Sequence, residues 1–256
     1  MEYVKFGYGK KIMIILQGAS VKPVSLNAET IKEAYKIFAE DFTVYVIDQK
    51  KDIEEGYSVD DMAEYVYSGC KGLGLDDVYF YGIAQGGMVG QLLAIKYPGF
   101  IRKMCICSTV SRVSDNSIIH QLAVFARKKD IFSLVSSFTK NVMSDDYYNK
   151  FFDQMIMVYK NLSDDELRDF AIRVDAMRNF DVVDRLHEIK IPVLVLGSKA
   201  DRIFSYEQMK LTADILGCES YFYEGYAHDV YDEAEDIKER ILNFFNSQDK
   251  INSNNI

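Results

Sequence analysis

The segment 78–95 constrains the fold more than any other part of this 256-residue chain. It begins with a short, aromatic-rich run over 78–83 that favours a strand, and after Ala84 it continues as an apolar helical pattern. Gly82 and Gly86 flank Ala84, each two residues away. This spacing predicts a sharp turn from strand into helix, with residue 84 in a strained backbone conformation and no room for side chains at the flanking positions.

The remainder of the chain alternates predicted strands and predicted helices. Several strands are continuously apolar, which is typical of strands buried on both faces of a sheet. The alternation predicts an α/β fold with a mainly parallel sheet and helices on both faces. The predicted strands cover residues 3–8, 11–16, 43–47, 78–83, 104–107, 192–197 and 220–223, and the helices between them cover about 27–40, 59–72, 88–95, 205–216 and 234–246.

A long segment without a convincing strand, residues 111–187, interrupts this alternation. It contains four helical patterns, and the spacing of Ser163 and Glu166 is that of a capping box at the start of the last one. We expect this insertion to form a helical cap over the carboxyl edge of the sheet. The predicted domains are therefore a core over 1–110 and 188–247, the cap over 111–187, and a polar tail over 248–256.

Four segments, in order, resemble the α/β-hydrolases, and in particular the small bacterial serine hydrolases with a helical cap, of the carboxylesterase or C–C hydrolase branch. The resemblance covers nearly the whole chain, and its strongest part is the glycine pattern around position 84, which matches the nucleophile elbow Gly-x-Ser-x-Gly. In this chain the serine position is occupied by Ala84. The segments are Lys11–Ser20, Val78–Pro98, Ile191–Asp201 and Tyr226–Phe245.

The resemblance also implies the partners of the nucleophile. Asp201, after the strand 192–197, occupies the position of the acid, and His228, after the last strand, occupies that of the base. The oxyanion hole would use the backbone N–H groups of Gln85 and Ala19. Gln17 stands where the family has histidine or proline before a glycine, and it serves either as a structural residue or as an additional donor to the pocket.

The predicted cap is rich in large apolar side chains, namely Phe125, Phe132, Phe138, Tyr147, Tyr148, Phe151, Phe152, Met155, Met157 and Tyr159. Most of these side chains are expected to form the core of the cap, and the remainder to cover an apolar pocket that favours a hydrophobic acyl or alcohol group. The pattern identifies no individual substrate-binding residue. Of the other titratable residues near these segments, Asp229 and His187 are expected at the surface, and His120 either at the surface of the cap or in its pocket.

Charge and cysteine content exclude several classes of partner. A formal net charge of −9 disfavours nucleic acid and anionic membranes, and no apolar run reaches the length of a membrane-spanning helix. With no evident signal peptide and no Cys-x-x-Cys pair, we expect a cytoplasmic protein with reduced thiols at Cys70, Cys105, Cys107 and Cys218. No metal or cofactor is expected, and the expected partner is a hydrophobic, ester-like small molecule or its acid product.

The alanine at position 84 leaves three functions open. The chain is a serine hydrolase silenced by an engineered serine-to-alanine substitution, or a natural pseudo-hydrolase that binds a ligand or a protein without cleaving it. The same fold also supports cofactor-free lyases and oxygenases. Asp201, His228 and both elbow glycines are retained, although a lineage long free of catalysis would be expected to lose them. The engineered form is therefore the favoured hypothesis.

Overall fold

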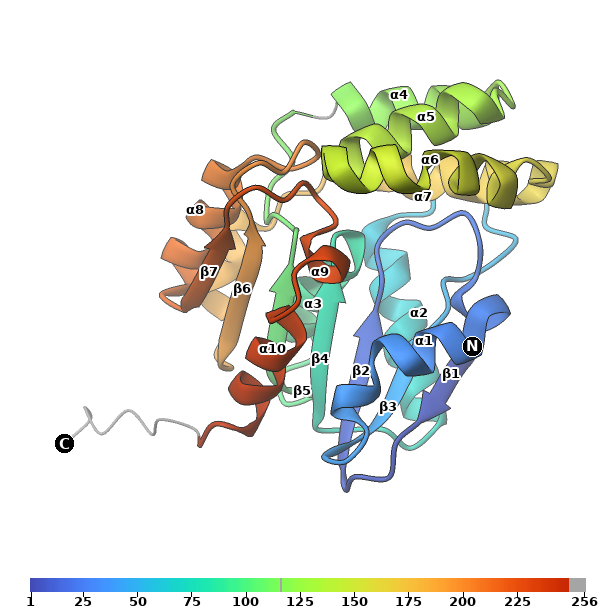
Figure 1. Cartoon of the computed structure of the whole chain (residues 1–256). Coiled ribbons are helices and arrows are strands. Elements are labelled where there is room, and N and C mark those ends of the chain that lie inside the picture. Colours follow the sequence, from blue (N-terminus) through green and yellow to red (C-terminus); the bar gives the residue numbers. More distant parts are fainter. Residues whose placement is uncertain (116, 249–256) are drawn as a thin grey trace.

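The computed structural model describes residues 1–115 and 117–248. Within these residues a central sheet is covered by helices on both faces, and a further layer of helices lies across one of its edges (Figure 1). The predicted α/β class is confirmed. The polar tail expected over 248–256 lies, from residue 249 on, outside the described residues.

The sheet has seven strands within the described part of the chain, in the order β1-β3-β2-β4-β5-β6-β7. Only β1 is antiparallel to its neighbour, and the other pairs are parallel. The carboxyl ends of β2 to β7 therefore meet at one edge, which points toward the helical layer in Figure 1. The strands are β1 Tyr3–Phe6, β2 Lys11–Leu16, β3 Phe42–Ile47, β4 Val78–Ile83, β5 Ile101–Cys107, β6 Val193–Ser198 and β7 Glu219–Tyr223.

The two faces of the sheet carry different helices (Figure 1). On one face, α3 is buried along nearly its whole length between the sheet and its neighbours α2 and η3, with α8 beside η3. On the other face lie α1, η2 and α10, with α10 packed against η2. The bounds of these helices, and of the short helices η1 and α9, are η1 Val24–Asn27, α1 Ala28–Ala34, η2 Lys36–Phe38, α2 Val59–Gly72, α3 Gln85–Lys96, η3 Val183–Glu188, α8 Tyr206–Leu216, α9 Val230–Glu233 and α10 Ile237–Asn246.

The helix predicted over 27–40 is interrupted, which corrects the sequence-based expectation. α1 ends at Ala34, and Tyr35 leaves the helical conformation with φ −113° and ψ 14° before η2 begins. The break turns the Tyr35 ring inward, where it is 2% exposed and lies 6.4 Å from the Phe38 ring and 6.5 Å from the Tyr81 ring. Burial of two aromatic rings outweighs the few lost helical hydrogen bonds.

The helical layer (α4–α7) lies between β5 and β6 in the sequence and above the carboxyl edge of the sheet in space (Figure 1). The capping box predicted at Ser163 and Glu166 is present at the start of α7. α7 is the most deeply buried of the four helices, whereas α6 has no fully buried residue. The four helices are α4 Ser117–Arg127, α5 Ile131–Val142, α6 Asp145–Tyr159 and α7 Asp164–Met177.

None of the helices in the described part of the chain is both long and apolar enough to cross a membrane. The four cysteines are free; three of them are buried, and Cys218 is half-buried.

Candidate active site

The turn from β4 into α3 holds Ala84 in the conformation that the sequence predicts. Its φ of 48° and ψ of −117° lie in a region that L-residues rarely adopt, and such a residue costs about 1–3 kcal/mol. The surrounding backbone keeps it there, because the Ala84 N–H donates to the Cys107 carbonyl at 2.9 Å and the Ala84 carbonyl accepts from the Gly87 N–H at 2.9 Å. The methyl group is therefore presented at the carboxyl edge of the sheet.

The two flanking glycines are required by close backbone contacts. A Cβ atom on Gly82 would lie 2.6 Å from the Gly86 carbonyl oxygen, at the start of α3. A Cβ atom on Gly86 would lie 2.0 Å from the carbonyl oxygen of Leu16, at the end of β2. Both distances are shorter than van der Waals contact, so the predicted collisions are confirmed and neither position accepts a side chain without moving the backbone.

Asp201 and His228 form a buried hydrogen-bonded pair. His228 Nδ1 lies 2.8 Å from Asp201 Oδ2. The His228 side chain is 6% exposed, and the Asp201 side chain is 0% exposed. The other carboxylate oxygen, Oδ1, accepts from the N–H groups of Ile203 at 2.8 Å and Phe204 at 3.0 Å. With both carboxylate oxygens engaged, the pair orients the imidazole with its proton on Nδ1, which leaves Nε2 as the basic nitrogen.

The backbone around His228 is tied to two other parts of the molecule. The Ser108 hydroxyl, just after β5, donates to the His228 carbonyl at 2.7 Å. The Asp229 N–H donates to the carbonyl of Val142, the last residue of α5, at 2.8 Å. The histidine loop is thus fixed between the sheet edge and the helical layer.

Ala84 and His228 line a single cavity of about 60 Å³, together with Gly18 and Ala19. Its remaining walls are apolar apart from Tyr231, and no Lys, Arg, Asp or Glu side chain lines it within the described residues. A cavity of this size holds a few water molecules or a small acyl group. Its upper walls come from α4, α5 and α7 and include Ile119, Leu122, Phe138, Phe170, Val174 and Met177.

The loop after β2 brings Gly18 and Ala19 against the elbow. A Cβ atom on Gly18 would lie 3.0 Å from the Ala84 Cβ and 3.9 Å from the Gln85 nitrogen, so glycine allows the close approach. Among residues 1–115 and 117–248, neither the Ala19 N–H nor the Gln85 N–H has a hydrogen-bond partner. Gln85 is the first residue of α3, where N–H groups have no partner within the helix. Two free donors therefore lie near the Ala84 methyl.

Three polar residues near the predicted motifs lie outside the cavity. Gln17 donates from Nε2 to the Tyr35 hydroxyl at 3.4 Å, which fits the structural alternative for this residue. His120 and His187 are both exposed, and His187 Nδ1 contacts the Asp184 carbonyl at 2.8 Å. No group of three His, Cys, Asp or Glu side chains is placed to hold a metal ion in the part of the chain that the structure describes.

The expectation that Asp229 faces solvent is wrong. The residue is half-buried, and burial, followed by the neighbouring charge of Asp232, raises the pKa of its carboxyl well above the usual value. The Tyr231 hydroxyl bonds to this carboxyl and opposes part of the rise. Sequence position beside a histidine gave no sign of this environment, because it depends on how α9 folds back onto the core.

Most of the residues that line the cavity were also not predicted from the sequence. Of the aromatic and methionine residues singled out in the predicted cap, Phe138 lines the cavity; Phe170 and Met177, which also line it, were not among them. Phe204 and Tyr231 were not singled out, although each closely follows a predicted site residue, which is the one local signal that would have suggested them.

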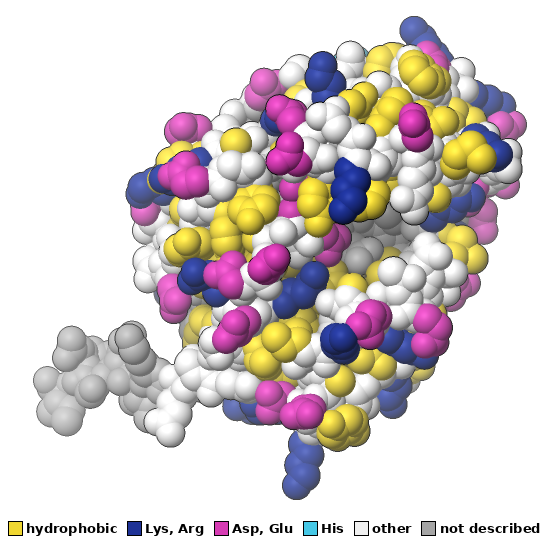
Figure 2. Space-filling view, viewed as in Figure 1, with side chains coloured by type: hydrophobic (Ala, Val, Ile, Leu, Met, Phe, Trp, Pro, Cys, Tyr) yellow, Lys and Arg dark blue, Asp and Glu magenta, His cyan; other side chains and the backbone are white. Residues whose placement is uncertain are grey.

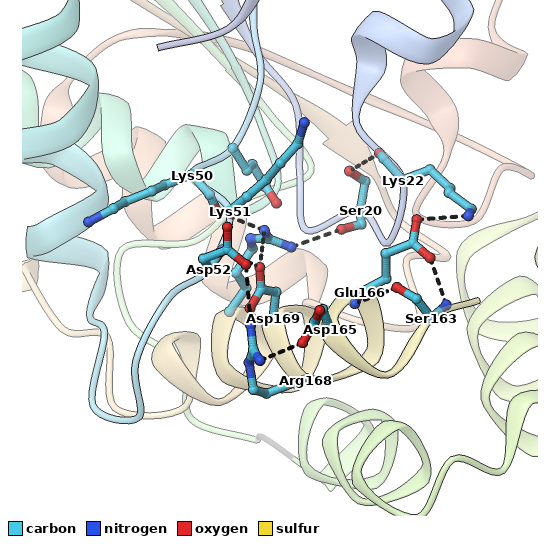
Figure 3. A network of polar contacts seen from close by, with 12 residues as sticks. Ser20, Lys22, Lys50, Lys51, Asp52, Ser163, Asp165, Glu166, Arg168 and Asp169 are labelled. Atoms are coloured by element: carbon cyan, nitrogen blue, oxygen red, sulfur yellow. Dashed lines mark hydrogen bonds and ion pairs between the residues drawn. The ribbon is translucent and has the colours of Figure 1, made fainter.

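A second opening is larger than the site cavity and lies outside it. This groove, about 490 Å³, runs between α7 and the loops that follow β2 and β3. Figure 2 shows the surface hollowed below the helical layer. The walls of the groove carry charges of both signs, and Lys22 and Glu166 form an ion pair at 2.7 Å across it (Figure 3). We find no single class of ligand that this mixture of charges would select.

The family model described as serine aminopeptidase, S33 matches residues 53–235, a range that contains the elbow, Asp201 and His228. The chain belongs to this family. It is therefore an α/β-hydrolase, as the four sequence segments and the sheet topology indicate.

Two relatives that are similar in sequence are hydrolases by name. The RutD protein of Rhizobium rhizogenes, a proposed carbamate hydrolase by its name, is 24% identical in an alignment 237 positions long that covers 83% of this α/β-hydrolase and 86% of that protein. The 3-oxoadipate enol-lactonase 2 of Acinetobacter baylyi is 21% identical over 147 residues, 57% of this chain and 55% of its own.

The solved enol-lactonase from Burkholderia xenovorans superposes with a TM-score of 0.84 at 18% identity, covering 96% of each chain. MGS-M2, an α/β hydrolase from a deep-sea metagenome, superposes with a TM-score of 0.85 at 19% identity, covering 96% of this chain and 94% of its own. At these identities the likeness establishes the α/β-hydrolase fold alone.

Proposed function

We propose that the form of this chain with serine at position 84 hydrolyses small, uncharged esters, and that the chain with Ala84 is inactive. One observation carries the proposal: a single cavity brings together three chemical groups. They are the strained residue 84, the buried pair Asp201–His228, and the free N–H groups of Ala19 and Gln85. A hydrolase that acts through an acyl-enzyme needs a nucleophile, an oriented base and donors for the oxyanion, in this arrangement.

The proposed mechanism assigns each group a step. The serine hydroxyl at position 84 attacks the ester carbonyl, and His228 Nε2 accepts its proton. Asp201 holds the ring through Nδ1 and stabilises the imidazolium. The N–H groups of Ala19 and Gln85 donate to the developing oxyanion, and His228 then protonates the leaving alcohol. A water molecule, activated by the same imidazole, releases the acid product.

The walls of the cavity define the proposed substrate class. Because no Lys, Arg, Asp or Glu side chain lines it among the described residues, a substrate carboxylate or ammonium group placed there would lose hydration without gaining a partner of opposite charge. We infer a short, apolar acyl or alcohol group. The helical layer, proposed here as a cap over 111–187, would exclude water from the reacting atoms.

The family relatives support acyl chemistry in general. Carbamate hydrolase and enol-lactonase are names for enzymes that cleave bonds to a carbonyl group, and both names belong to proteins similar to this chain. In this chain the apolar walls favour an uncharged ester over a charged lactone or carbamate. The retained Asp201–His228 pair and elbow glycines favour an engineered substitution at position 84 over an ancient loss.

The test is the variant Ala84→Ser. We expect it to hydrolyse p-nitrophenyl acetate and butyrate with release of acid and alcohol, while the chain with Ala84 is slower by about 10⁶-fold, as in serine hydrolases that lose the nucleophile. Ala28→Ser, which adds the same hydroxyl at the start of α1, is the matched control and should remain inactive. A product other than acid and alcohol would indicate lyase or oxygenase chemistry.

A natural pseudo-hydrolase is the second candidate, and the alanine itself is the observation that favours it. In that case Ala84→Ser would show no turnover with esters, amides or carbamates, and the cavity would serve to bind a ligand. Calorimetry of the Ala84 chain with short carboxylic acids and esters would then identify the ligand class directly.

A further inference from the structure

Gln49, in the loop after β3, bonds to the segment that carries one of the two proposed oxyanion donors. Its Nε2 donates to the Gly18 carbonyl at 2.8 Å. The adjacent Asp48 is 2% exposed and accepts from the N–H groups of Val24 at 2.6 Å and Ser25 at 3.2 Å. Two neighbouring residues at the end of β3 thus hold the loop that follows β2 at two points.

The bond to Gly18 acts on the Ala19 N–H through a single peptide group. The carbonyl of Gly18 and the N–H of Ala19 belong to the same planar trans peptide, and they point in opposite directions. A donor that fixes the carbonyl on one side therefore fixes the N–H on the other. Ala19 lines the site cavity and Gly18 lies against Ala84, so this peptide plane stands beside the reacting position.

We propose that Gln49 is a positioning residue that orients the Ala19 N–H toward the oxyanion, an inference that rests on the proposed hydrolase function. Gln49 acts through the Gly18–Ala19 peptide and has no contact with the substrate. A hydrogen bond accepted by the carbonyl also polarises the peptide and strengthens the N–H as a donor.

The side-chain amide of Gln49 makes its hydrogen bonds through Nε2 and not through Oε1. Its Nε2 also lies 3.4 Å from Gln85 Oε1, whereas its own Oε1 is buried and has no hydrogen-bond partner among the described residues. A buried amide oxygen without a partner is unfavourable. The side chain is therefore oriented by what its N–H groups bind, which is the loop and the residue after the elbow.

The network continues into α7. Gln85 donates from Nε2 to the Arg173 carbonyl at 2.6 Å, so the side chain after the elbow is anchored on the helical layer. The Arg173 guanidinium, with its side chain 7% exposed, donates to the Lys50 carbonyl at 2.8 Å and more weakly to the Ser20 carbonyl at 3.4 Å. The carbonyls on both sides of Ala19 are thus held, one by Gln49 and one from α7; Figure 3 shows Ser20 and Lys50 in this region.

The sequence offers a selective probe of this peptide. Gly18-Ala19 is the only Gly-Ala dipeptide in the chain, so labelling glycine carbonyls with ¹³C and alanine nitrogens with ¹⁵N leaves one coupled amide signal. We expect Gln49→Met and Gln49→Glu, which lack the N–H donor and keep the length of the side chain, to shift that signal. Gln154→Glu, on the exposed face of α6, adds the same charge and should leave it unchanged. The measurement uses the chain with Ala84 and requires no activity.

Kinetics in the Ala84→Ser background supply the second readout. We expect both Gln49 variants to lower kcat by about 10- to 100-fold with KM changed less than about threefold, because a donor aligned to the oxyanion acts in the transition state. A merely structural role would instead lower the melting temperature and the amount of active enzyme, and titration of active sites with a fluorophosphonate corrects for the latter.

The outcomes separate this inference from the proposed function. An unmoved Gly18–Ala19 signal would overturn the role of Gln49 whatever the activity, and so would a moved signal with unchanged kcat in an active serine form. A moved signal with no activity in any serine form would overturn the proposed hydrolase and with it the oxyanion role, while Gln49 would remain the residue that orients this peptide.

Discussion

The floor and the roof of the site cavity are built from different interactions. The floor consists of loops at the strand ends, where hydrogen bonds to the backbone fix Ala84, His228 and the Asp201 carboxylate. The roof consists of apolar side chains from α4, α5 and α7, which make no hydrogen bond to the floor residues inside the cavity. In the proposed hydrolase the floor would set the chemistry, and the roof would set which substrate reaches it.

The largest expected effect concerns the floor. In the Ala84→Ser background, His228→Ala should lower kcat by about 10⁴- to 10⁶-fold, because the serine loses its base, and Asp201→Asn should lower it by about 10³- to 10⁴-fold through the wrong imidazole tautomer. Steady-state kinetics with p-nitrophenyl acetate measures both. A loss of less than about tenfold for His228→Ala would show that the floor does not carry the chemistry.

Substitutions in the roof should instead change the selectivity for acyl chain length. Phe138 lies between the site cavity and a second apolar cavity of about 50 Å³ lined by Leu134, Val135 and Tyr159. Phe138→Ala should join the two and raise kcat/KM for hexanoate relative to acetate esters by about tenfold or more, since one methylene group in an apolar pocket contributes at least about tenfold.

Phe132→Ala is the control for this substitution. Phe132 lies on the same helix but is 65% exposed and outside both cavities, so its removal should leave the ratio of hexanoate to acetate hydrolysis unchanged. Equal effects of the two substitutions, or a fall of kcat for all esters with Phe138→Ala, would contradict the division between floor and roof.

Backbone strain at the floor gives a smaller effect on stability. Ala84→Gly should raise the free energy of unfolding by about 1 kcal/mol, since glycine tolerates the positive φ at this position. Ala94→Gly, inside α3, should lower it by about 1 kcal/mol, because glycine weakens a helix interior. Urea unfolding followed by circular dichroism compares them, and changes of the same sign would show that position 84 is not strained.

The smallest effect concerns Asp229. Because the pKa of its carboxyl is raised in the folded state, the folded protein retains a proton that the unfolded chain releases, so its contribution to stability is full below about pH 4 and is lost as the pH rises through the folded-state pKa. Asp229→Asn removes this loss. Its melting temperature should exceed that of the parent by more at about pH 8 than at about pH 4, and a gain independent of pH would contradict the raised pKa.

Local patterns predicted the turn at Ala84, and the family resemblance was needed for the rest of the floor. The glycine spacing around Ala84 reports collisions within a few residues, and the capping box at Ser163 reports hydrogen bonds within one helical turn. The alternation of elements predicted that the strand ends share an edge, and the resemblance to the α/β-hydrolases implied that Asp201 and His228 lie together there.

Local patterns could not predict the roof residues or the contacts that hold the loops of the floor. An amphipathic helix identifies its apolar face, but not whether that face meets another helix or an open cavity, so Phe138 could not be distinguished from Phe152, which packs against Phe132. Gln49 and Arg173 are separated from their partners by up to 153 residues, and no spacing rule connects them. The interruption of the first helix at Tyr35 likewise depends on the distant Tyr81 ring.

The most direct test of the proposed site is covalent labelling with a fluorophosphonate followed by peptide mapping. We expect the Ala84→Ser variant to be labelled on the introduced serine alone and the parent chain to remain unlabelled. The Ala84→Ser variant that also carries His228→Ala should react more slowly by about 10³-fold or more. Absence of label on the introduced serine, or equal labelling rates with and without His228, would show that positions 84 and 228 do not act together.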